Sequence, residues 1–426
     1  MSIPLDRLYH FIEDIAKEIK DNVIIYRFWP HGSKKLIDLG ELTGPISWQQ
    51  KTLNFSIYCH DQEPLNYKLY QNCVDNDYVK TLKSMSEYID DNLITHPTIY
   101  DHVCLIHSEK RSNELIRYQA HSNHKFIDVY YWCHAVIALD WFRYAQHLEQ
   151  KKQVEKTFLI YNRAWSGTRE YRLKFAELLI KLNLQDCCRA TINPVEPEVG
   201  IHYSQHQFKN PAWRPYTVLE DHFPISVAQS HYSADFDIKD YEATDIEVVL
   251  ETLFDDSRLH LTEKSLRPVA CGQPFIFAGT HGSLEYLRSY GFRTFGDVWD
   301  ESYDNIKDPR RRLQAIADLM QQISIWSPEV RKQKMAQAQI ITQYNKKLFF
   351  SAEFFNLVVK ELTDNLKTAI DRCASEPNTT VFVQHWKKVL GYKEMQDYLT
   401  TNSNINLPIL DAVKYVLEIA KKSTKT

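Results

Sequence analysis

Short apolar runs that end in polar clusters are the feature of this chain that most restricts its fold. Three such runs, at residues 22–29, 55–59 and 103–107, are rich in β-branched and aromatic residues, as buried strands are. A helical pattern over residues 77–92 separates the second run from the third. Strands that alternate with helices form parallel sheets, in which ligand-binding groups gather just past the carboxyl ends of the strands.

A second series of strands and helices follows a charged stretch at residues 149–156, which we interpret as a domain boundary. Apolar runs predict its strands, and amphipathic runs that stop at Gly predict its helices. The predicted strands are 158–161, 225–228, 246–250 and 274–279, and the predicted helices are 168–184, 263–271 and 283–290. Beyond them the sequence is mostly helical, over 310–323 and from 328 to about 373.

These elements predict an α/β fold with two Rossmann-like domains and a helical C-terminal segment. We expect an N-terminal domain at residues 1–150, a second domain at 151–330 and the helical segment at 331–426. A chain of 426 residues is long enough for two domains of this size, each with its own core.

Composition excludes several classes of protein. The chain has 51 Lys and Arg residues against 55 Asp and Glu, a net charge of -4, so strong non-specific binding to nucleic acid is not expected. Aromatic residues make up 13%, which excludes a disordered chain. The sequence starts without a signal-peptide pattern, no apolar run reaches ~18 residues, and the eight cysteines form no C-x-x-C pair. We therefore expect a cytoplasmic protein without a membrane span.

Several common catalytic motifs are missing from the sequence. It has no G-x-G-x-x-G, P-loop, H-E-x-x-H or G-x-S-x-G pattern, which removes the usual support for four large enzyme classes. Asp235 and Asp237 form a D-x-D pattern, for which we favour a solvated loop over a metal site. His202 and His206 are four residues apart, but nearby prolines argue against the helix that a metal-binding pair would need. We expect no metal site.

Residues 251–279 are the most informative stretch for function. A strand ends at Glu251, and a Thr-Glu-Lys sequence then opens a helix that stops at Gly272. The N-terminus of a helix presents backbone N–H groups and a partial positive charge, which suit a diphosphate. Lys264 would add a full charge beside the phosphates. Glu251 and Glu263 can accept hydrogen bonds from the hydroxyl groups of a sugar or ribose.

The pattern Glu…Thr-Glu-Lys…Gly-x-Pro, followed by four apolar residues and Gly, resembles the donor-binding motif of fucosyltransferases that act on GlcNAc-type acceptors. Leu250-Glu251-Thr252 stands where that family often has Phe-Glu-Asn, which leaves the sugar and the nucleotide of the donor open. The resemblance implies a GT-B fold and metal-independent transfer, preferably inverting. It implies a nucleotide-diphosphate sugar as co-substrate and no other cofactor. It also implies that the helical segment packs back across the domains.

A broader set of segments is similar to uncharacterised tailed-phage proteins. These segments are 60–64, 107–110, 131–135, 140–143, 161–165, 291–297 and 299–304. Together they resemble phage-type glycosyltransferases over most of residues 23–320. This resemblance implies a UDP-sugar or related donor, double-stranded phage DNA with a hydroxylated or hydroxymethylated cytosine as acceptor, and the host cytoplasm as location. The alternatives are a glycan or lipopolysaccharide acceptor, and a non-catalytic module that binds nucleotides or carbohydrates.

Within this frame the basic residues of the second domain become candidate donor ligands. Tyr161 and Arg163 directly follow a predicted strand, and Arg169 and Arg172 lie on one face at the start of the next helix. Arginines there can neutralise the diphosphate leaving group. For Arg169 and Arg172, pairing with surface carboxylates is an equal alternative. The candidate donor-binding residues are Tyr161, Arg163, Arg169, Arg172, Glu251, Glu263 and Lys264.

An inverting transfer needs a general base for the acceptor hydroxyl. Asp61 and Glu63 lie in a dense polar cluster at the end of a predicted strand, so we take them as the candidates. The cluster at residues 107–110 could serve in the same way or form only caps and salt bridges. His134 on a predicted aromatic-rich helix fits a core position better, and the arginines at 310–312 fit a solvated helix face.

Overall fold

A computed structural model describes residues 12, 14, 15, 18, 23–26, 55–60, 62, 64, 65, 102–114, 116, 126–190, 192–197, 199–223 and 234–375. These residues fall into two compact units. The first contains residues 109–111 and 132–359, and the second contains the other described residues. The charged stretch 149–156 lies within the first unit, and the predicted domain boundaries stay a prediction.

The second unit contains a parallel sheet of four strands. The strands are β1 (Val23–Tyr26), β2 (Phe55–His60), β3 (His102–His107) and β4 (Phe126–Tyr130), in the order β1-β2-β3-β4. His60 pairs with His107, and His107 pairs with Tyr130, so the carboxyl ends of three strands lie in register. The sequence predicted the first three of these strands but not β4. The predicted helix at 77–92 lies outside the described residues.

Part of helix α11 (Ala352–Ser375) belongs to the second unit, from Lys360 onward. Its buried residues there recur at helical spacing on one face. They are Leu362, Leu366, Ala369 and Ile370. The Asn365 amide donates to the carbonyl oxygen of Tyr130 at 2.7 Å, which ties the helix to the end of β4.

The first unit begins with α4 (Cys133–Trp141) and contains a second parallel sheet. Its further elements are η2 (Arg143–His147), β5 (Lys156–Ile160), η3 (Gly167–Arg169), α5 (Tyr171–Lys181), η4 (Gln185–Cys187), β6 (Cys188–Ala190), η5 (Tyr203–Gln205), η6 (Pro211–Trp213), α6 (Ile238–Glu242), β7 (Thr244–Leu250), α7 (Glu263–Cys271), β8 (Phe275–Ala278), α8 (Ser283–Ser289), η7 (Ser302–Asn305), α9 (Pro309–Ser324) and α10 (Pro328–Phe349). The sheet order is β6-β5-β7-β8.

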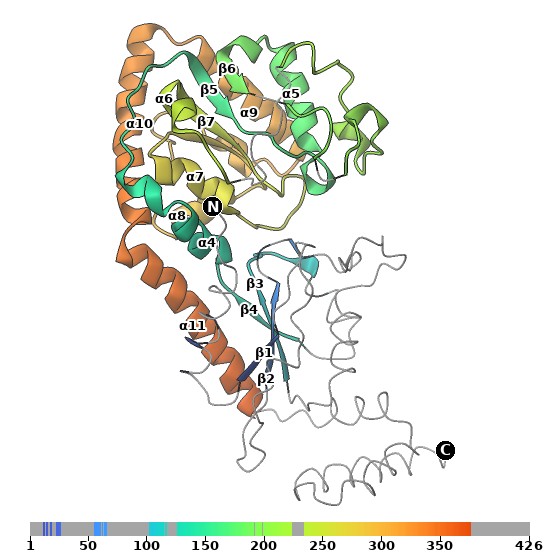
Figure 1. Cartoon of the computed structure of the whole chain (residues 1–426), viewed down its shortest axis with the longest axis vertical. Coiled ribbons are helices and arrows are strands. Elements are labelled where there is room, and N and C mark those ends of the chain that lie inside the picture. Colours follow the sequence, from blue (N-terminus) through green and yellow to red (C-terminus); the bar gives the residue numbers. More distant parts are fainter. Residues whose placement is uncertain are drawn as a thin grey trace, which may run out of the picture. The chain divides into compact units, whose positions relative to one another are not determined.

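The strands that follow β5 and β7 in the chain are added on opposite sides of the β5–β7 pair. Helix α5 leads from β5 to β6 at one side, whereas α7 leads from β7 to β8 at the other. Because crossovers between parallel strands are right-handed, the two helices cover opposite faces of the sheet. Figure 1 agrees, with α5 beside α9 and α7 beside α10. The predicted α/β fold with parallel sheets is therefore confirmed, although the predicted strand at 225–228 lies outside the described residues.

The predicted helices in this unit are confirmed with one correction. The single helix expected from 328 to about 373 is broken, because α10 ends at Phe349 and α11 begins at Ala352. The Ser351 hydroxyl accepts a hydrogen bond from the backbone N–H of Phe354 at 3.2 Å, which starts a new helix. Helix α7 ends as predicted at Gly272, whose φ of 71° lies in the left-handed region.

None of the helices among the described residues combines the length and the hydropathy of a membrane-spanning segment.

Candidate functional site

The first unit brings the predicted donor-binding residues to one edge of its sheet. The reversal between β5 and β7 is a switch point, and parallel sheets bind their ligands past the carboxyl ends of strands at such points. Residues 161–172 follow β5, residues 251–264 follow β7, and residues 279–283 follow β8. We call these three segments the carboxyl edge.

Arg172 joins the segments that follow β5 and β7. Its side chain is buried, with 3% exposed, and its guanidinium donates to the carbonyl oxygens of Ala164 and Leu250, both at 2.6 Å, and of Glu251 at 3.1 Å. Burial lowers its pKa. Surface pairing, the alternative weighed from the sequence, is wrong for this residue. Arg172 instead links two segments of the carboxyl edge to each other, and its predicted contact with a donor stays a prediction.

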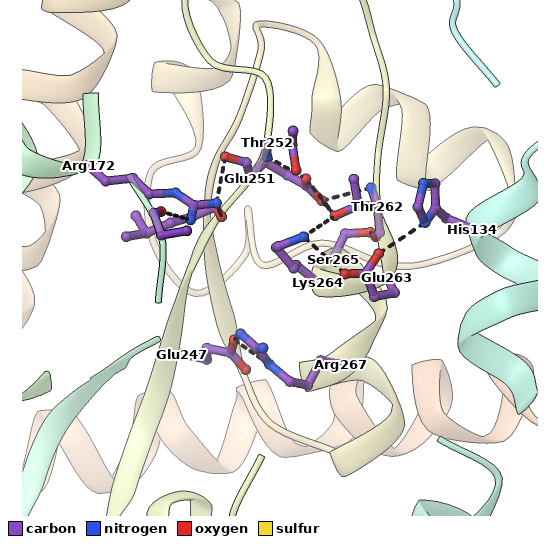
Figure 2. Close-up of polar contacts among 12 residues, drawn as sticks. His134, Arg172, Glu247, Glu251, Thr252, Thr262, Glu263, Lys264, Ser265 and Arg267 are labelled. Carbon is purple, nitrogen blue, oxygen red and sulfur yellow. Dashed lines mark hydrogen bonds and ion pairs between the residues drawn. The ribbon is translucent and has the colours of Figure 1, made fainter. Parts of the chain in front are cut away.

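Glu251 closes the long loop between β7 and α7. Its buried carboxylate accepts from the backbone N–H of Thr252 at 2.8 Å and of Thr262 at 2.9 Å. The Thr262 hydroxyl lies 2.8 and 3.1 Å from its two oxygens. Because this hydroxyl points to Glu251, Thr262 makes no side-chain cap on α7, although it is the residue before the helix. Figure 2 shows this network beside the first turn of the helix.

Glu263 and Lys264 form a buried charge cluster with His134 in the first turn of α7. The Glu263 carboxylate lies 3.0 Å from the Lys264 amine and 3.0 Å from Nδ1 of His134, which α4 supplies. Burial acts to raise the pKa of Glu263, but the charge of Lys264 and the hydrogen bond from His134 outweigh it and hold this pKa well below its usual range. Glu263 is therefore ionised and acts as the counter-ion of Lys264.

The hydroxyl of Thr262 and the imidazole of His260 also contact this cluster. The Lys264 amine lies 3.3 Å from the Thr262 hydroxyl. The ring of His260 packs edge-on against that of His134, with 5.1 Å between the ring centres. His134 is buried, as the sequence indicated. The sequence treated it only as a core residue, however, and its contact with Glu263 was not predicted, because it joins residues far apart in the chain.

The other predicted donor ligands lie on the segment after β5, in different surroundings. Arg163 and Arg169 are half-buried, and Nε of Arg169 donates to the carbonyl oxygen of Ser166 at 3.4 Å. The hydroxyl of Tyr161 donates to Asp240 at 2.8 Å, and the guanidinium carbon of Arg267 lies 4.5 Å from the centre of its ring. Tyr161 thus packs against α6 and α7, and its predicted donor contact stays a prediction.

Two charged residues that the sequence did not single out fix α7 to the sheet. Arg267 donates to Glu247 at 2.6 and 3.1 Å, and the Tyr241 hydroxyl donates to the same carboxylate at 2.6 Å. Both side chains of the ion pair are buried. A Glu within the apolar strand 244–250 was the available signal, since such a carboxylate needs a buried partner.

The prediction of a solvated helix face for the basic run at residues 310–312 is wrong for Arg312, whereas Arg310 and Arg311 are exposed. Arg312 is 1% exposed rather than solvated, and it donates to the carbonyl oxygens of Gly279 at 3.0 Å and Ile306 at 2.6 Å. It also bonds the Phe254 carbonyl and lies over the ring of Phe254. Arg312 therefore braces the carboxyl edge from α9, as Arg172 does from α5.

The clusters after β2 and β3 give different outcomes. The predicted bases Asp61 and Glu63 lie outside the described residues. In the cluster at 107–110, Glu109 pairs with Arg258 at 3.1 Å, and His107 lies 3.7 Å from Asp128. The Glu109–Arg258 ion pair fits the second alternative, caps and salt bridges, and the alternative role as a base stays a prediction. Within the described residues no group of three or more His, Cys, Asp and Glu side chains could hold a metal ion.

A scan against protein-family models and searches of curated proteins and of solved structures found no match to this chain. Any function of the carboxyl edge must therefore be inferred from its geometry.

Proposed function

We propose that this chain is a glycosyltransferase that takes its sugar from a nucleotide-diphosphate sugar and holds the diphosphate at the N-terminus of α7. One observation carries the proposal: the start of α7 lacks a side-chain cap, lies at the switch point of the sheet and has a buried lysine in its first turn. The first N–H groups of a helix have no partners within the helix, and the helix dipole favours an anion there.

The charges of the edge support a diphosphate in particular. Lys264 has its counter-ion in Glu263, but Arg172 and Arg312 bond only backbone carbonyls through the contacts given above. Arg163 and Arg169 follow β5 at the same switch point. A guanidinium near the diphosphate would stabilise the negative charge that develops when the glycosidic bond breaks.

The rest of the proposal extends the resemblances of the sequence. The two parallel sheets would belong to two Rossmann-like domains of GT-B type, and transfer would be metal-independent and inverting. Asp61 or Glu63 would take the proton of the acceptor hydroxyl, because an ionised carboxylate can act as a base without further activation. We favour a hydroxylated cytosine in phage DNA as acceptor, with a glycan or lipopolysaccharide as the alternative.

Binding of the nucleotide is the first test. Calorimetric titration of the full chain with UDP, GDP, CDP and ADP, in EDTA, should give binding for one nucleotide. Lys264→Ala should weaken it at least tenfold, because a charge in contact with the phosphates is lost. Lys332→Ala is the matched control, since it removes the same charge from an exposed position on α10. No binding by any of the four would overturn the proposal.

Turnover is the second test. The full chain is mixed with the corresponding nucleotide sugar and with either hydroxymethylcytosine DNA or a glycan, and nucleotide release and acceptor mass are measured. We expect transfer to the DNA, and loss of transfer but not of nucleotide binding in Asp61→Asn or Glu63→Gln. Transfer to the glycan alone would replace the acceptor. Binding without turnover on either acceptor would favour the non-catalytic module.

A further inference from the structure

A second cluster of reactive side chains lies on the chain segment that connects β6 to α6, outside the site described above. Oγ of Ser204 lies 2.8 Å from Nδ1 of His202, and Nε2 of His202 lies 2.7 Å from Oε1 of Glu220. We propose that Ser204, His202 and Glu220 form a nucleophilic triad that attacks carboxylic esters with apolar acyl chains. This activity is independent of the sugar transfer proposed above.

The contacts of His202 fix which ring nitrogen carries the proton. Two donors point to Nδ1, namely the Ser204 hydroxyl and the Ser204 backbone N–H at 3.2 Å. A carboxylate faces Nε2. The neutral ring that satisfies both sides therefore has its proton on Nε2 and its lone pair on Nδ1, directed at the serine hydroxyl. This is the arrangement that a general base needs to activate a serine.

Glu220 is itself held in place. Its second oxygen accepts from the Tyr203 hydroxyl at 2.5 Å, and that hydroxyl accepts from the backbone N–H of Leu219 at 3.1 Å. Burial acts to raise the pKa of Glu220, but hydrogen bonds from Tyr203, its own backbone N–H and His202 outweigh this effect and lower the pKa. The ionised carboxylate orients the ring and stabilises the imidazolium that forms during attack.

The surroundings of the triad indicate the class of ester. Ser204 is exposed, and apolar side chains close to the triad in the sequence are exposed as well. These are Val195 (39% exposed), Val199 (52%), Ile201 (40%) and Val218 (54%). Val195 pairs with His202 in an antiparallel bridge, and Val218 precedes the residue that bonds Tyr203. Exposed apolar groups on the segments that carry a nucleophile favour a substrate whose acyl chain covers them.

The reaction balances with water as the second substrate. Oγ of Ser204 forms a bond to the carbonyl carbon of the ester, and its proton moves to Nδ1 of His202. The carbon–oxygen bond to the alcohol then breaks, and His202 gives the proton to the departing alcohol. A water molecule attacks the acyl-serine, passing one proton to His202, which returns it to Ser204 as the carboxylic acid leaves.

The test uses the full chain and an alkyl fluorophosphonate, in which the serine displaces fluoride at phosphorus. Intact-mass and peptide mass spectrometry should find one adduct, on Ser204. Ser204→Ala should abolish it, and His202→Gln or Glu220→Gln should slow labelling at least tenfold, since a positioned base contributes about 10² or more. Ser302→Ala is the matched control, because the Ser302 hydroxyl bonds Asp300 at 2.7 Å and should not react.

The substrate class is tested with p-nitrophenyl esters. The octanoate should be hydrolysed faster than the acetate, and Val218→Ser should reduce this preference while leaving the labelling of Ser204 intact. Thermal unfolding of each variant confirms that it is folded. An unlabelled wild-type Ser204, or labelling at the same rate in His202→Gln, would overturn the triad. Equal rates on the two esters would overturn the apolar acyl chain.

Discussion

Two regions of the first unit hold their buried charges in opposite ways. Beneath α7, Arg267 and Glu247 pair side chain to side chain, and their charges cancel. At the carboxyl edge, Arg172 and Arg312 are held by backbone carbonyl oxygens, which carry only partial charges. Burial lowers the pKa of Arg172, and it lowers the pKa of Arg312 to about 10.

This difference separates a region whose charges stabilise the fold from one that we propose to bind an anion. A neutral ion pair between a strand and a helix fixes their geometry but attracts no charged ligand. Two guanidinium groups on carbonyl oxygens keep their full charge while organising the loops around the switch point. The carboxyl edge thus has two buried guanidinium groups beside its loops, and we propose that their charge favours a diphosphate there.

Breaking the pair beneath α7 should have the largest effect. Arg267→Met leaves the Glu247 carboxylate buried without its cation, and we expect a loss of about 3–5 kcal/mol in the free energy of unfolding. The double variant Glu247→Leu with Arg267→Met removes both charges and should recover most of that loss. Urea denaturation of the three proteins measures this. A double variant as unstable as the single one would show that the loss does not come from an unpaired Glu247 carboxylate.

Replacing Arg172 should reduce stability less than breaking the pair beneath α7, but it should weaken nucleotide binding more. Arg172→Met leaves carbonyl oxygens of Ala164 and Leu250 without their donor, at about 2–4 kcal/mol in total. The segments after β5 and β7 then lose their link, so nucleotide affinity should fall as well. Arg214→Met, at an exposed position outside the carboxyl edge, is the control; it should cost less than about 1 kcal/mol and leave nucleotide affinity unchanged. Denaturation and calorimetry on the same samples separate the two effects.

Asp304 extends the comparison to a carboxylate at the same edge. It accepts from the backbone N–H groups of Ser283 at 3.0 Å and Leu284 at 3.1 Å, and burial raises its pKa to about 6. A raised pKa contributes stability below the unfolded value near 3.8, and this contribution is lost as the pH rises through 6.

The side chain in Asp304→Asn cannot ionise, so this variant should not lose that stability as the pH rises. Relative to wild type, its free energy of unfolding should rise by about 2–3 kcal/mol between pH 4 and pH 7, at about 1.4 kcal/mol per pKa unit. Denaturation curves across that range measure the change. A difference between the two proteins that stays constant with pH would contradict the raised pKa.

The sequence predicted the elements of the edge better than its contacts. The apolar strand 246–250, the Thr-Glu-Lys opening and the Gly272 stop identified β7 and α7, because these signals are local. The bond from Arg172 to Leu250 joins residues 78 positions apart, and no periodicity encodes it. The run at 310–312 was misleading, because charge alone does not tell which residue of a helix faces inward. Arg312 does so beside the buried Leu313 and Ile316.

Replacing Glu263 should have the smallest effect, and it decides whether this carboxylate is a counter-ion or a sugar ligand. The sequence suggested that its carboxylate holds sugar hydroxyls, whereas the structure makes it the counter-ion of Lys264. If it is the counter-ion, Glu263→Gln leaves the lysine unbalanced, and the free nucleotide diphosphate should bind roughly tenfold more tightly, about 1.4 kcal/mol. Because the pKa of Glu263 is lowered on folding, its contribution to stability exists above the unfolded pKa and is lost as the pH falls. The variant should therefore show less loss of stability in acid.

Calorimetry with the nucleotide diphosphate and with its sugar conjugate separates the two roles. Glu285→Gln on α8 is the matched control, since it removes a negative charge from an exposed position. A counter-ion predicts tighter binding of both ligands in Glu263→Gln. A sugar ligand predicts unchanged binding of the nucleotide and weaker binding of the conjugate, because only the conjugate carries the hydroxyl groups.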